Sequence, residues 1–587
     1  PRTDVADTTV QTFDEQGLLI QTTNALGHRT QFQDHNAEGL PQTMIDENNV
    51  VTELRYTTRG WLDTVTVKSA LGDVITDYDY YPNGLVQSIV QPNGVRLDYE
   101  YDDAKRLTRI TNNLNQYVEY ELNALGNREV ERIHASNGEL VRQHNFAFDE
   151  LGRLLKKFGI NDQELETYTY DGNGNITRIT DYNLLDVVQG FDGLDRLQTV
   201  TDREGGETVY QYDDLDQVDT VTDANENVTD YDYNGFGFLT QLNSPDTGIT
   251  QYTDYDLAGN LLAKVDARGV VINYTYDALN RIKTVTFPSA PEKNITYFYD
   301  ETNTSGFPNA GVGRLTRIVE ASGIETSWIY NDLGQIVRDI RTIGGQSFNV
   351  QYEYDLAGTM TKIIYPSGRE VEYIQDSLSR TQRIRTRKTS ADSWIVLADN
   401  VNYQPFGPVS AFTYGNGLAF AQSYDLHYRP DVIQTLDGTT DLQALDYGFN
   451  DNNELSEILD LVNADNSKSF DYDGNIRLIE AAGPYGIKSY DYDDVGNRVL
   501  RATAASPVSE NYAETYTIAD DSNRLNAVSA AGTGGQNATY VYDEVGNITN
   551  DGQYGYDYDV RGRLSRVFQG ANTIARYDYN AISERVS

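Results

Sequence analysis

The stretch YDLAGNL at residues 255–261 decides the fold of this 587-residue chain, because copies of it recur at a regular step. Aromatic residues begin successive copies about 21 positions apart, at Phe148, Tyr170, Phe191, Tyr212, Tyr233, Tyr255 and Tyr276. The same frame extends back to Phe13 and forward to Tyr579. A fixed period of this length indicates stacked units, none of which buries its apolar face alone.

Each copy carries the residues of a tight hairpin turn directly after its aromatic residue. Asp at the first position accepts hydrogen bonds from nearby backbone N–H groups, and Gly at the fourth adopts left-handed φ values. Asp195, Asp216 and Asn280 replace that Gly in three copies, and both residue types tolerate this conformation. We select four clear copies as structural repeat positions: Tyr170, Asp171, Gly174, Tyr255, Asp256, Gly259, Tyr542, Asp543, Gly546, Tyr558, Asp559 and Gly562.

The residues on either side of the turn predict two short antiparallel strands. The segment 176–180 is rich in β-branched residues, and no helical period competes with this pattern. Tyr168 and Tyr170, like the other tyrosine pairs at this spacing, share one strand face, so we expect a cross-strand aromatic ladder between repeats. The sequence therefore predicts an all-β fold of tandem hairpins in one long sheet.

The repeat is regular over about 13–380 and 471–587 and divergent over about 381–470. We expect one continuous array over 1–587, because each unit uses its neighbours and separate cores are not needed. The sequence starts at Pro1 and stops within a repeat, from which we expect a fragment of a larger protein.

Three features interrupt the pattern. The insertion Glu301–Gly313 predicts a loop that projects from the array. Pro405 and Pro408 cannot donate to a sheet and predict an edge, a bulge or a connection. A basic patch comprises Arg380, Arg383, Arg385, Arg387 and Lys388. Arg383, Arg385 and Arg387 alternate onto one strand face, where we expect solvation or pairing with Asp, with a partner-binding patch as the alternative.

Composition excludes several classes of protein. The formal net charge of −43 argues against a surface for nucleic acid or an anionic membrane. The chain has no cysteine, and no apolar run reaches the length of a membrane span. We attribute the acidity to turn chemistry and solubility, with an acidic binding surface as the alternative.

The sequence shows no recognisable catalytic, metal-binding or nucleotide-binding motif. The five histidines show no zinc-binding spacing, and no nucleophile elbow, phosphate loop or dinucleotide fingerprint occurs. Residues 171–175 resemble the start of a calcium loop, but Ile176 and Tyr182 stand where an EF-hand needs Gly and Glu. We therefore expect a non-enzymatic chain with no cofactor and no metal. A glycosidase has only the abundance of carboxylates in its favour.

The motif at 255–261, with its copies at 542–548 and 558–564, resembles the YD repeat of the Rhs family over about Phe13 to Arg585. Residues 403–408 and 414–418 are also similar to a segment of bacterial Rhs proteins. The resemblance implies a spiralling sheet that forms a hollow shell, as in Rhs polymorphic toxins, insecticidal toxin-complex cocoons and teneurins. In the toxin branch it implies an enclosed C-terminal toxin domain, released at an Asp-Pro motif. This chain has no Asp-Pro, so no catalytic residue is carried over.

Two functions follow as hypotheses. The first is the repeat shell of a secreted or surface-delivered bacterial Rhs protein, which would enclose a toxin or cargo domain from the missing C-terminal part and contact secretion or cell-surface components. The second is a cell-surface adhesion or carbohydrate-contact scaffold, similar to wall-associated and teneurin-like proteins. In both cases we expect an extracellular location.

Overall fold

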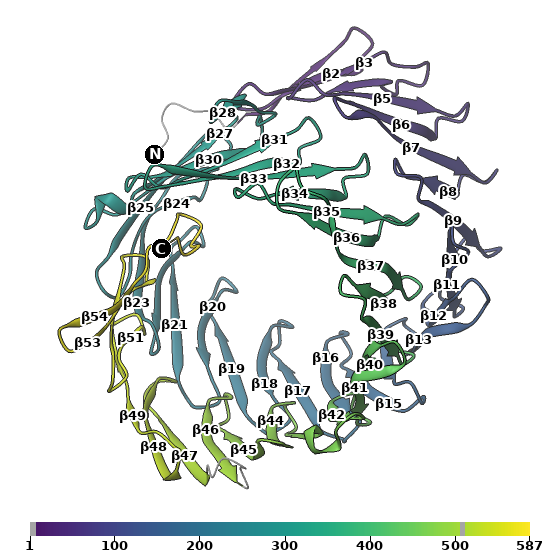
Figure 1. The fold of residues 1–587 in the computed structure, drawn as a ribbon. Helices are drawn as coiled ribbons and strands as arrows, with labels where there is room; N and C mark the ends of the chain where they lie inside the picture. Colours follow the sequence, from purple (N-terminus) through teal and green to yellow (C-terminus); the bar gives the residue numbers. More distant parts are fainter. Residues whose placement is uncertain (1–7, 505–510, 587) are drawn as a thin grey trace.

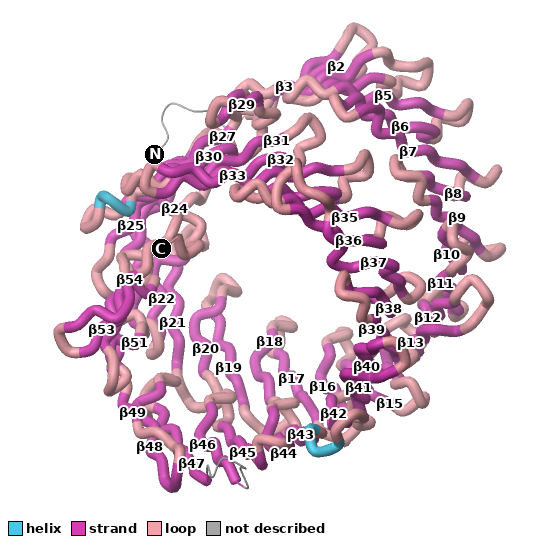
Figure 2. The backbone as a smooth tube through the Cα atoms, viewed as in Figure 1, coloured by secondary structure: helices cyan, strands magenta, loops and turns pink. Residues whose placement is uncertain are grey.

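The computed structural model describes residues 8–504 and 511–586, which form short strands joined by tight turns (Figure 2). The helices of this part are two 3-10 turns, η1 (Pro291–Lys293) and η2 (Ala464–Asn466). One sheet of 47 strands extends from β1 (Val10–Phe13) to β49 (Ala538–Thr539). A further sheet of five strands extends from β50 (Val541–Tyr542) to β54 (Asn572–Arg576). The predicted all-β array of hairpins is confirmed.

Strands pair antiparallel with their neighbours along the chain. In a typical hairpin, β15 (Glu164–Tyr170) pairs with β16 (Ile176–Asp181), and the register shifts by a bulge at Tyr170, next to the turn. The same shift recurs beside the repeat aromatic residue of most hairpins, for example at Tyr212, Tyr233 and Tyr276. Bulges increase the local twist of a strand. The recurrent bulge therefore increases the twist at the same point of most hairpins.

The sheet curves into a ring and then continues as a second winding beside the first (Figure 1). Strands from β2 (Leu19–Thr23) to β25 (Val271–Tyr276) make the first winding, and strands from β30 (Leu315–Glu320) to β49 run alongside it. Hydrogen bonds between the two windings join positions that are 262 to 300 residues apart in the sequence. The right-handed twist of strands accumulates over such a long sheet and bends it. The result is a spiralling shell one sheet thick.

Burial is thin along most of the wall, as expected for a single layer. An apolar cluster lies near the point where the chain passes from the first winding to the second, and it includes Phe287, Ile295 and Ile318. Ala581, close to the end of the chain, packs into the same cluster. This cluster fixes the C-terminal turn against the start of the second winding.

The prediction that Glu301–Gly313 projects from the array was wrong. The insertion forms a small hairpin of β28 (Asn303–Thr304) and β29 (Phe307–Pro308), in which Thr304 is 1% and Asn309 is 7% exposed. The Asn309 amide donates to Thr304 Oγ1 at 2.8 Å and to the carbonyl of Trp328 at 3.0 Å. Polar side chains that are satisfied in this way hold a loop on the sheet, because burying them without partners would be costly.

The predicted aromatic ladder was also wrong. Tyr168 lies opposite Ile179, and Tyr170 lies opposite Ile176, because each tyrosine-bearing strand alternates with an aliphatic strand. The ring of Tyr170 is covered by the guanidinium of Arg153, which lies 4.3 Å from the ring centre. Cation–π contacts therefore take the place of direct stacking between tyrosines.

The segment with two prolines is a connection within the sheet. β37 (Ile395–Tyr403) pairs with β38 (Val409–Tyr414), with a bulge between Asp399 and Asn402. The backbone N–H of Gln404 donates to the carbonyl of Pro408 at 2.8 Å, so a tight turn forms in spite of the prolines. Of the three expected alternatives, an edge, a bulge or a connection, the structure shows a connecting turn next to a bulge.

Candidate functional site: the polar seam between the windings

The turn after each repeat tyrosine is held by its aspartate. Asp171 Oδ1 accepts hydrogen bonds from the backbone N–H groups of Asn173, Gly174 and Asn175 at 2.8 to 2.9 Å. The amide of Asn175 and these N–H groups lower the pKa of Asp171. Gly174 has a φ of +98°, which most residues with a side chain avoid.

The other three selected copies form the same turn. Asp256 accepts from the backbone N–H of Ala258 and Asn260, Asp543 from Val545 and Asn547, and Asp559 from Arg561 and Arg563. The glycines at the fourth position of these turns have φ between +76° and +86°; they are Gly259, Gly546 and Gly562. Each selected tyrosine donates from its hydroxyl to a backbone carbonyl of the preceding repeat: Tyr170 to Leu154, Tyr255 to Leu239, Tyr542 to Leu525 and Tyr558 to Ile548, at 2.6 to 2.9 Å.

Sequence reasoning missed the residue directly after the turn glycine. In the copy that starts at Phe148, Arg153 Nε donates to Asp149 Oδ2 at 2.7 Å, and the same guanidinium covers the ring of Tyr170 in the next repeat. Arg196, Arg281, Arg477 and Arg563 repeat this arrangement with the tyrosine of the following repeat. The recurrence of Arg or Asn at this position was the signal in the sequence. Where this residue is arginine, it links each turn to its neighbour along the wall.

All turns that follow the repeat tyrosines lie on one edge of the sheet, because strands alternate in direction. We call this row the Tyr-Asp edge and the other row of turns the opposite edge. Where the windings lie side by side, the Tyr-Asp edge of the second winding contacts the opposite edge of the first. We call this line of contact the seam.

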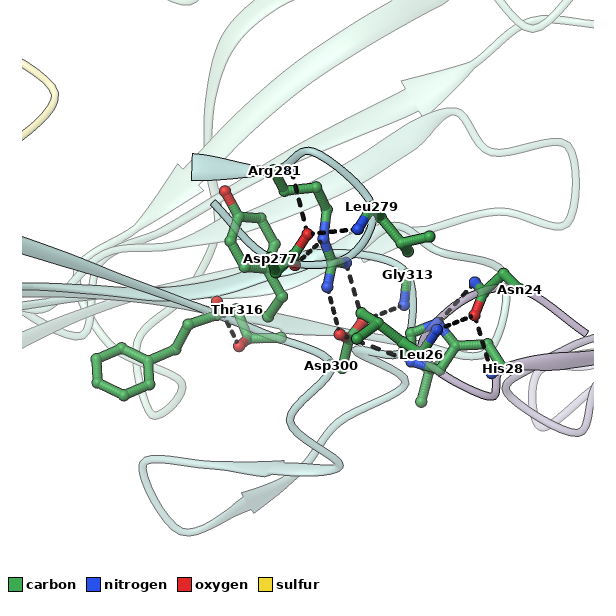
Figure 3. A network of polar contacts seen from close by, with 12 residues as sticks. Asn24, Leu26, His28, Asp277, Leu279, Arg281, Asp300, Gly313 and Thr316 are labelled. Carbon is green, nitrogen blue, oxygen red and sulfur yellow. Dashed lines mark hydrogen bonds and ion pairs between the residues drawn. The ribbon is translucent and has the colours of Figure 1, made fainter. Parts of the chain in front are cut away.

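The seam begins with a charged network (Figure 3). His28 in the first winding lies 3.6 Å from Asp300, which also accepts from the Arg281 guanidinium at 2.6 Å. Burial favours a higher pKa for Asp300, but hydrogen bonds from Arg281 and from the backbone of Gly313 outweigh burial and lower that pKa. An ionised carboxylate therefore joins the two windings where they first meet.

Further along, turns of the two windings bond directly to each other. Asn48 exchanges two hydrogen bonds with the backbone of Val312, each 3.0 Å long. Asp332 accepts from the Ser69 hydroxyl at 2.9 Å and from the Ala70 N–H at 2.5 Å. The seam therefore combines side-chain and main-chain contacts, as an edge without strand pairing requires.

Asn523 connects two turns of the first winding, 223–227 and 244–248, with the turn 493–497 of its own winding. Its Nδ2 donates to Asp223 at 2.7 Å, and its Oδ1 accepts from Asn225, Asn227 and Asn497 at 3.0 to 3.2 Å. Its backbone N–H donates to Asp246 Oδ1 at 2.7 Å. Neutral amides thus separate several carboxylates that would otherwise repel each other.

Glycines allow the two backbones to approach closely. A Cβ atom on Gly206 would lie 2.8 Å from the carbonyl oxygen of Asp494, and one on Gly248 would lie 2.8 Å from that of Glu544. A Cβ on Gly546, one of the selected positions, would lie 2.6 Å from the carbonyl oxygen of Asp246. These contacts leave little free space in the seam at these points.

The basic cluster of the divergent segment is paired. Arg383 bonds to Asp399 at 2.7 Å and Arg387 to Glu370 at 2.7 Å, while Arg385 bonds to Glu372. Arg385 and Arg387 also cover the ring of Trp394. The expectation of paired guanidinium groups is confirmed, although two of the three partners are Glu and not Asp.

Within residues 8–504 and 511–586, no group of three or more His, Cys, Asp or Glu side chains is placed to hold a metal ion. Residues 171–175 form the turn described above, in which Asp171 is occupied by hydrogen bonds. In the same part of the chain, no helix is long and apolar enough to cross a membrane.

Comparison with known proteins agrees with this geometry. Residues 127–310 match the family model of the teneurin YD shell, and residues 80–114 match that of the RHS repeat. No curated protein matches the sequence.

Solved structures share the fold over nearly the whole chain. The crystal structure of TcdB2-TccC3 aligns with a TM-score of 0.74 and 16% identity, and covers 99% of this chain and 37% of that one. The same complex without its hypervariable C-terminal region gives 0.73 and 14%, with 99% and 38% covered. A Photorhabdus luminescens Tc holotoxin pore gives 0.72 and 15%, with 99% and 38% covered. The chain spans less than two fifths of the length of these proteins, and at this identity the likeness shows a common fold.

Proposed function

We propose that this chain, whose repeats are of the RHS and YD type, is a non-enzymatic wall that encloses a cargo domain of its parent protein. The observation that carries the proposal is the seam, because it joins two windings of a one-layer sheet into a continuous wall (Figure 1). A sheet that served only as a spacer would not need Asn523, Asp332 and Asn48 to bond across windings.

The cargo we propose is a C-terminal toxin domain that follows the repeats in the parent protein. One of the similar solved structures is described as TcdB2-TccC3 without its hypervariable C-terminal region, which is consistent with a shell that carries an exchangeable domain. We further propose one continuous repeat array over 1–587, delivery by a bacterium, and an extracellular site of action. Components of a secretion system or of the cell surface are the partners that fit this function.

Protease protection tests the wall. The full natural reading frame, including any domain downstream of residue 587, is treated with trypsin at neutral pH and the fragments are identified by mass. We expect the downstream domain to resist cleavage in the native protein and to become sensitive in the seam variant Asn523→Ala. Asn416→Ala, on the free opposite edge of the second winding, is the matched control and should leave the domain protected. A downstream domain cleaved as fast in the native protein as when free would refute enclosure.

One observation favours a second function, contact with carbohydrate at the free Tyr-Asp edge of the first winding. Phe236 is 86% exposed and stacks on Phe238, which stacks on Tyr255. These rings border a cleft of about 330 Å³. Exposed aromatic faces of this kind suit apolar sugar faces.

A glycan array tests this second function. Binding that is lost in Phe236→Ala and kept in Leu151→Ala, which changes a 76% exposed residue in another turn of the same edge, outside the cleft, would support a carbohydrate site. If native protein binds no glycan on the array, the adhesion hypothesis loses its structural basis.

A further inference from the structure

Two histidines from different windings meet at the seam. His144 lies in β13 (Leu140–Phe148) of the first winding, and His427 lies in the turn 425–429 of the second. Their ring centres are 4.9 Å apart. Beside them, the backbone N–H of Gln143 donates to the carbonyl of Leu426 at 2.8 Å, which is a direct main-chain bond between the windings.

The hydrogen bonds around His144 require a neutral ring. Arg142 Nε lies 3.2 Å from His144 Nε2. A guanidinium only donates, so this ring nitrogen must be the unprotonated acceptor. Protonation of Nε2 would replace that hydrogen bond by a contact between two cations.

The carboxylates close to the two histidines already bind arginines. On the first winding, Arg142 lies 3.5 Å from Glu131 of β12 (Arg128–His134), which pairs opposite His144. On the second winding, Arg429 bonds to Asp425 at 2.6 Å, and the neighbouring Tyr428 lies under the Arg142 guanidinium. Each carboxylate is thus engaged by an arginine. Protonation of both imidazoles would place four cations beside only two carboxylates, Glu131 and Asp425, which favour the charged rings but are outweighed.

We propose that the contact between His144 and His427 is a latch between the windings, which holds while both imidazoles are neutral and releases the seam when they are protonated. The shell function gives this latch its use, as a way to open the wall in an acidic compartment. The proposed effect of the two histidines on the seam does not depend on the presence of a cargo.

The direction of the pH effect follows from the surroundings of the two rings. Burial lowers the pKa of both, and the neighbouring His144 helps to bring the pKa of His427 to about 4. Because these values lie below that of a histidine in an open seam, about 6.5, closure is fully favoured only above that pH. As pH falls from about 6.5 towards about 4, His427 lowers the ratio of closed to open seam by up to about tenfold per pH unit, and His144 acts in the same direction.

Hydrogen exchange as a function of pH tests the latch. Backbone exchange of segments 140–148 and 425–429 is followed between about pH 7.5 and 4.5 and corrected for the intrinsic pH dependence of exchange. In the native protein we expect opening of 425–429 to increase at least about tenfold between pH 6.5 and 5. His427→Gln and His144→Gln each keep a neutral polar side chain and remove one of the two titrating rings, so the increase should be clearly smaller in each variant and less than twofold in the double variant. His35→Gln, outside this contact, should behave like the native protein.

Two results would overturn the proposal. One is a pH profile that is the same in the native protein and in both glutamine variants. The other, which does not depend on any variant folding, is ordinary titration of all five histidines near pH 6.5 in NMR spectra of the native protein. If trypsin cleaves the downstream domain of the native protein at neutral pH but hydrogen exchange shows the expected pH dependence, enclosure is refuted and the latch is supported.

Discussion

At the scale of residues, one short motif does three tasks. The aspartate closes the turn through backbone N–H groups, as Asp171 does, and the glycine allows the left-handed conformation. The arginine or asparagine that follows binds the aspartate and, where it is arginine, covers the next tyrosine, as Arg153 covers Tyr170. The tyrosine hydroxyl then returns to the backbone of the preceding repeat. Each repeat is thereby coupled to the next without a deep apolar core.

Replacement of Asn523 tests the seam at this scale. Asn523→Ala removes an amide that serves Asp223, Asn225 and Asn497, so partly buried polar groups lose a partner. We expect a loss of about 1–3 kcal/mol in the free energy of unfolding, measured with urea, and faster hydrogen exchange at 223–227 and 493–497. Asn416→Ala, in an exposed turn, should change stability by less than about 0.5 kcal/mol. Equal effects of the two substitutions would show that the seam amide has no special role.

At the scale of elements, the hairpin is the repeating unit. The turn within each hairpin and the turn that joins it to the next hairpin have different roles. Turns of the Tyr-Asp edge in the second winding contact turns of the opposite edge in the first, with glycines such as Gly206 at the closest approach. The insertion Glu301–Gly313 follows the same logic, since Val312 bonds to Asn48 across the seam. An enlarged turn has therefore become part of the wall.

Gly206→Ala tests close contact between the elements. Gly206 does not need a left-handed φ, so the added Cβ acts through its contacts. The tightest is with the carbonyl oxygen of Asp494 at 2.8 Å, followed by Asp202 Oδ2 at 3.1 Å and the Cβ of Ala224 at 3.2 Å. We expect a loss of about 1–3 kcal/mol in stability from this overpacking, measured by urea unfolding. Gly193→Ala, in a turn where a Cβ would meet nothing within 4 Å, should be neutral or stabilise by about 0.4–1 kcal/mol. If Gly206→Ala is as stable as Gly193→Ala, the windings do not touch there in solution.

At the scale of the whole molecule, a strongly acidic chain closes on itself. Its formal charge of −43 opposes compaction, and the turn hydrogen bonds offset this repulsion locally. Several turn aspartates, among them Asp149, Asp171 and Asp192, have pKa values lowered by hydrogen bonds from backbone and side chains. The wall is therefore most strongly held together when these carboxylates are ionised.

Acid unfolding tests this balance. A carboxylate whose pKa is lower in the folded state stabilises the fold above its unfolded pKa, near 3.9, and loses that contribution as pH falls further. We expect the free energy of unfolding, measured with urea at each pH, to decline in two steps. The first, between about pH 6.5 and 4, should become smaller in His427→Gln, because only the contribution of His144 remains. The second, below about pH 4, should remain in that variant, and its absence from both proteins would contradict the role of the turn aspartates.

The sequence by itself determined the turns, the short strands and the all-β class, because these depend on local chemistry within each repeat. Asp171 and Gly174 specify their turn whatever lies nearby, and so the hairpin array could be predicted. The tertiary structure alone decided how the two edges meet, where the insertion lies, and that His144 faces His427. Those contacts join positions hundreds of residues apart, and they depend on the small rotation that each hairpin adds, summed around a whole winding. No single repeat contains that sum.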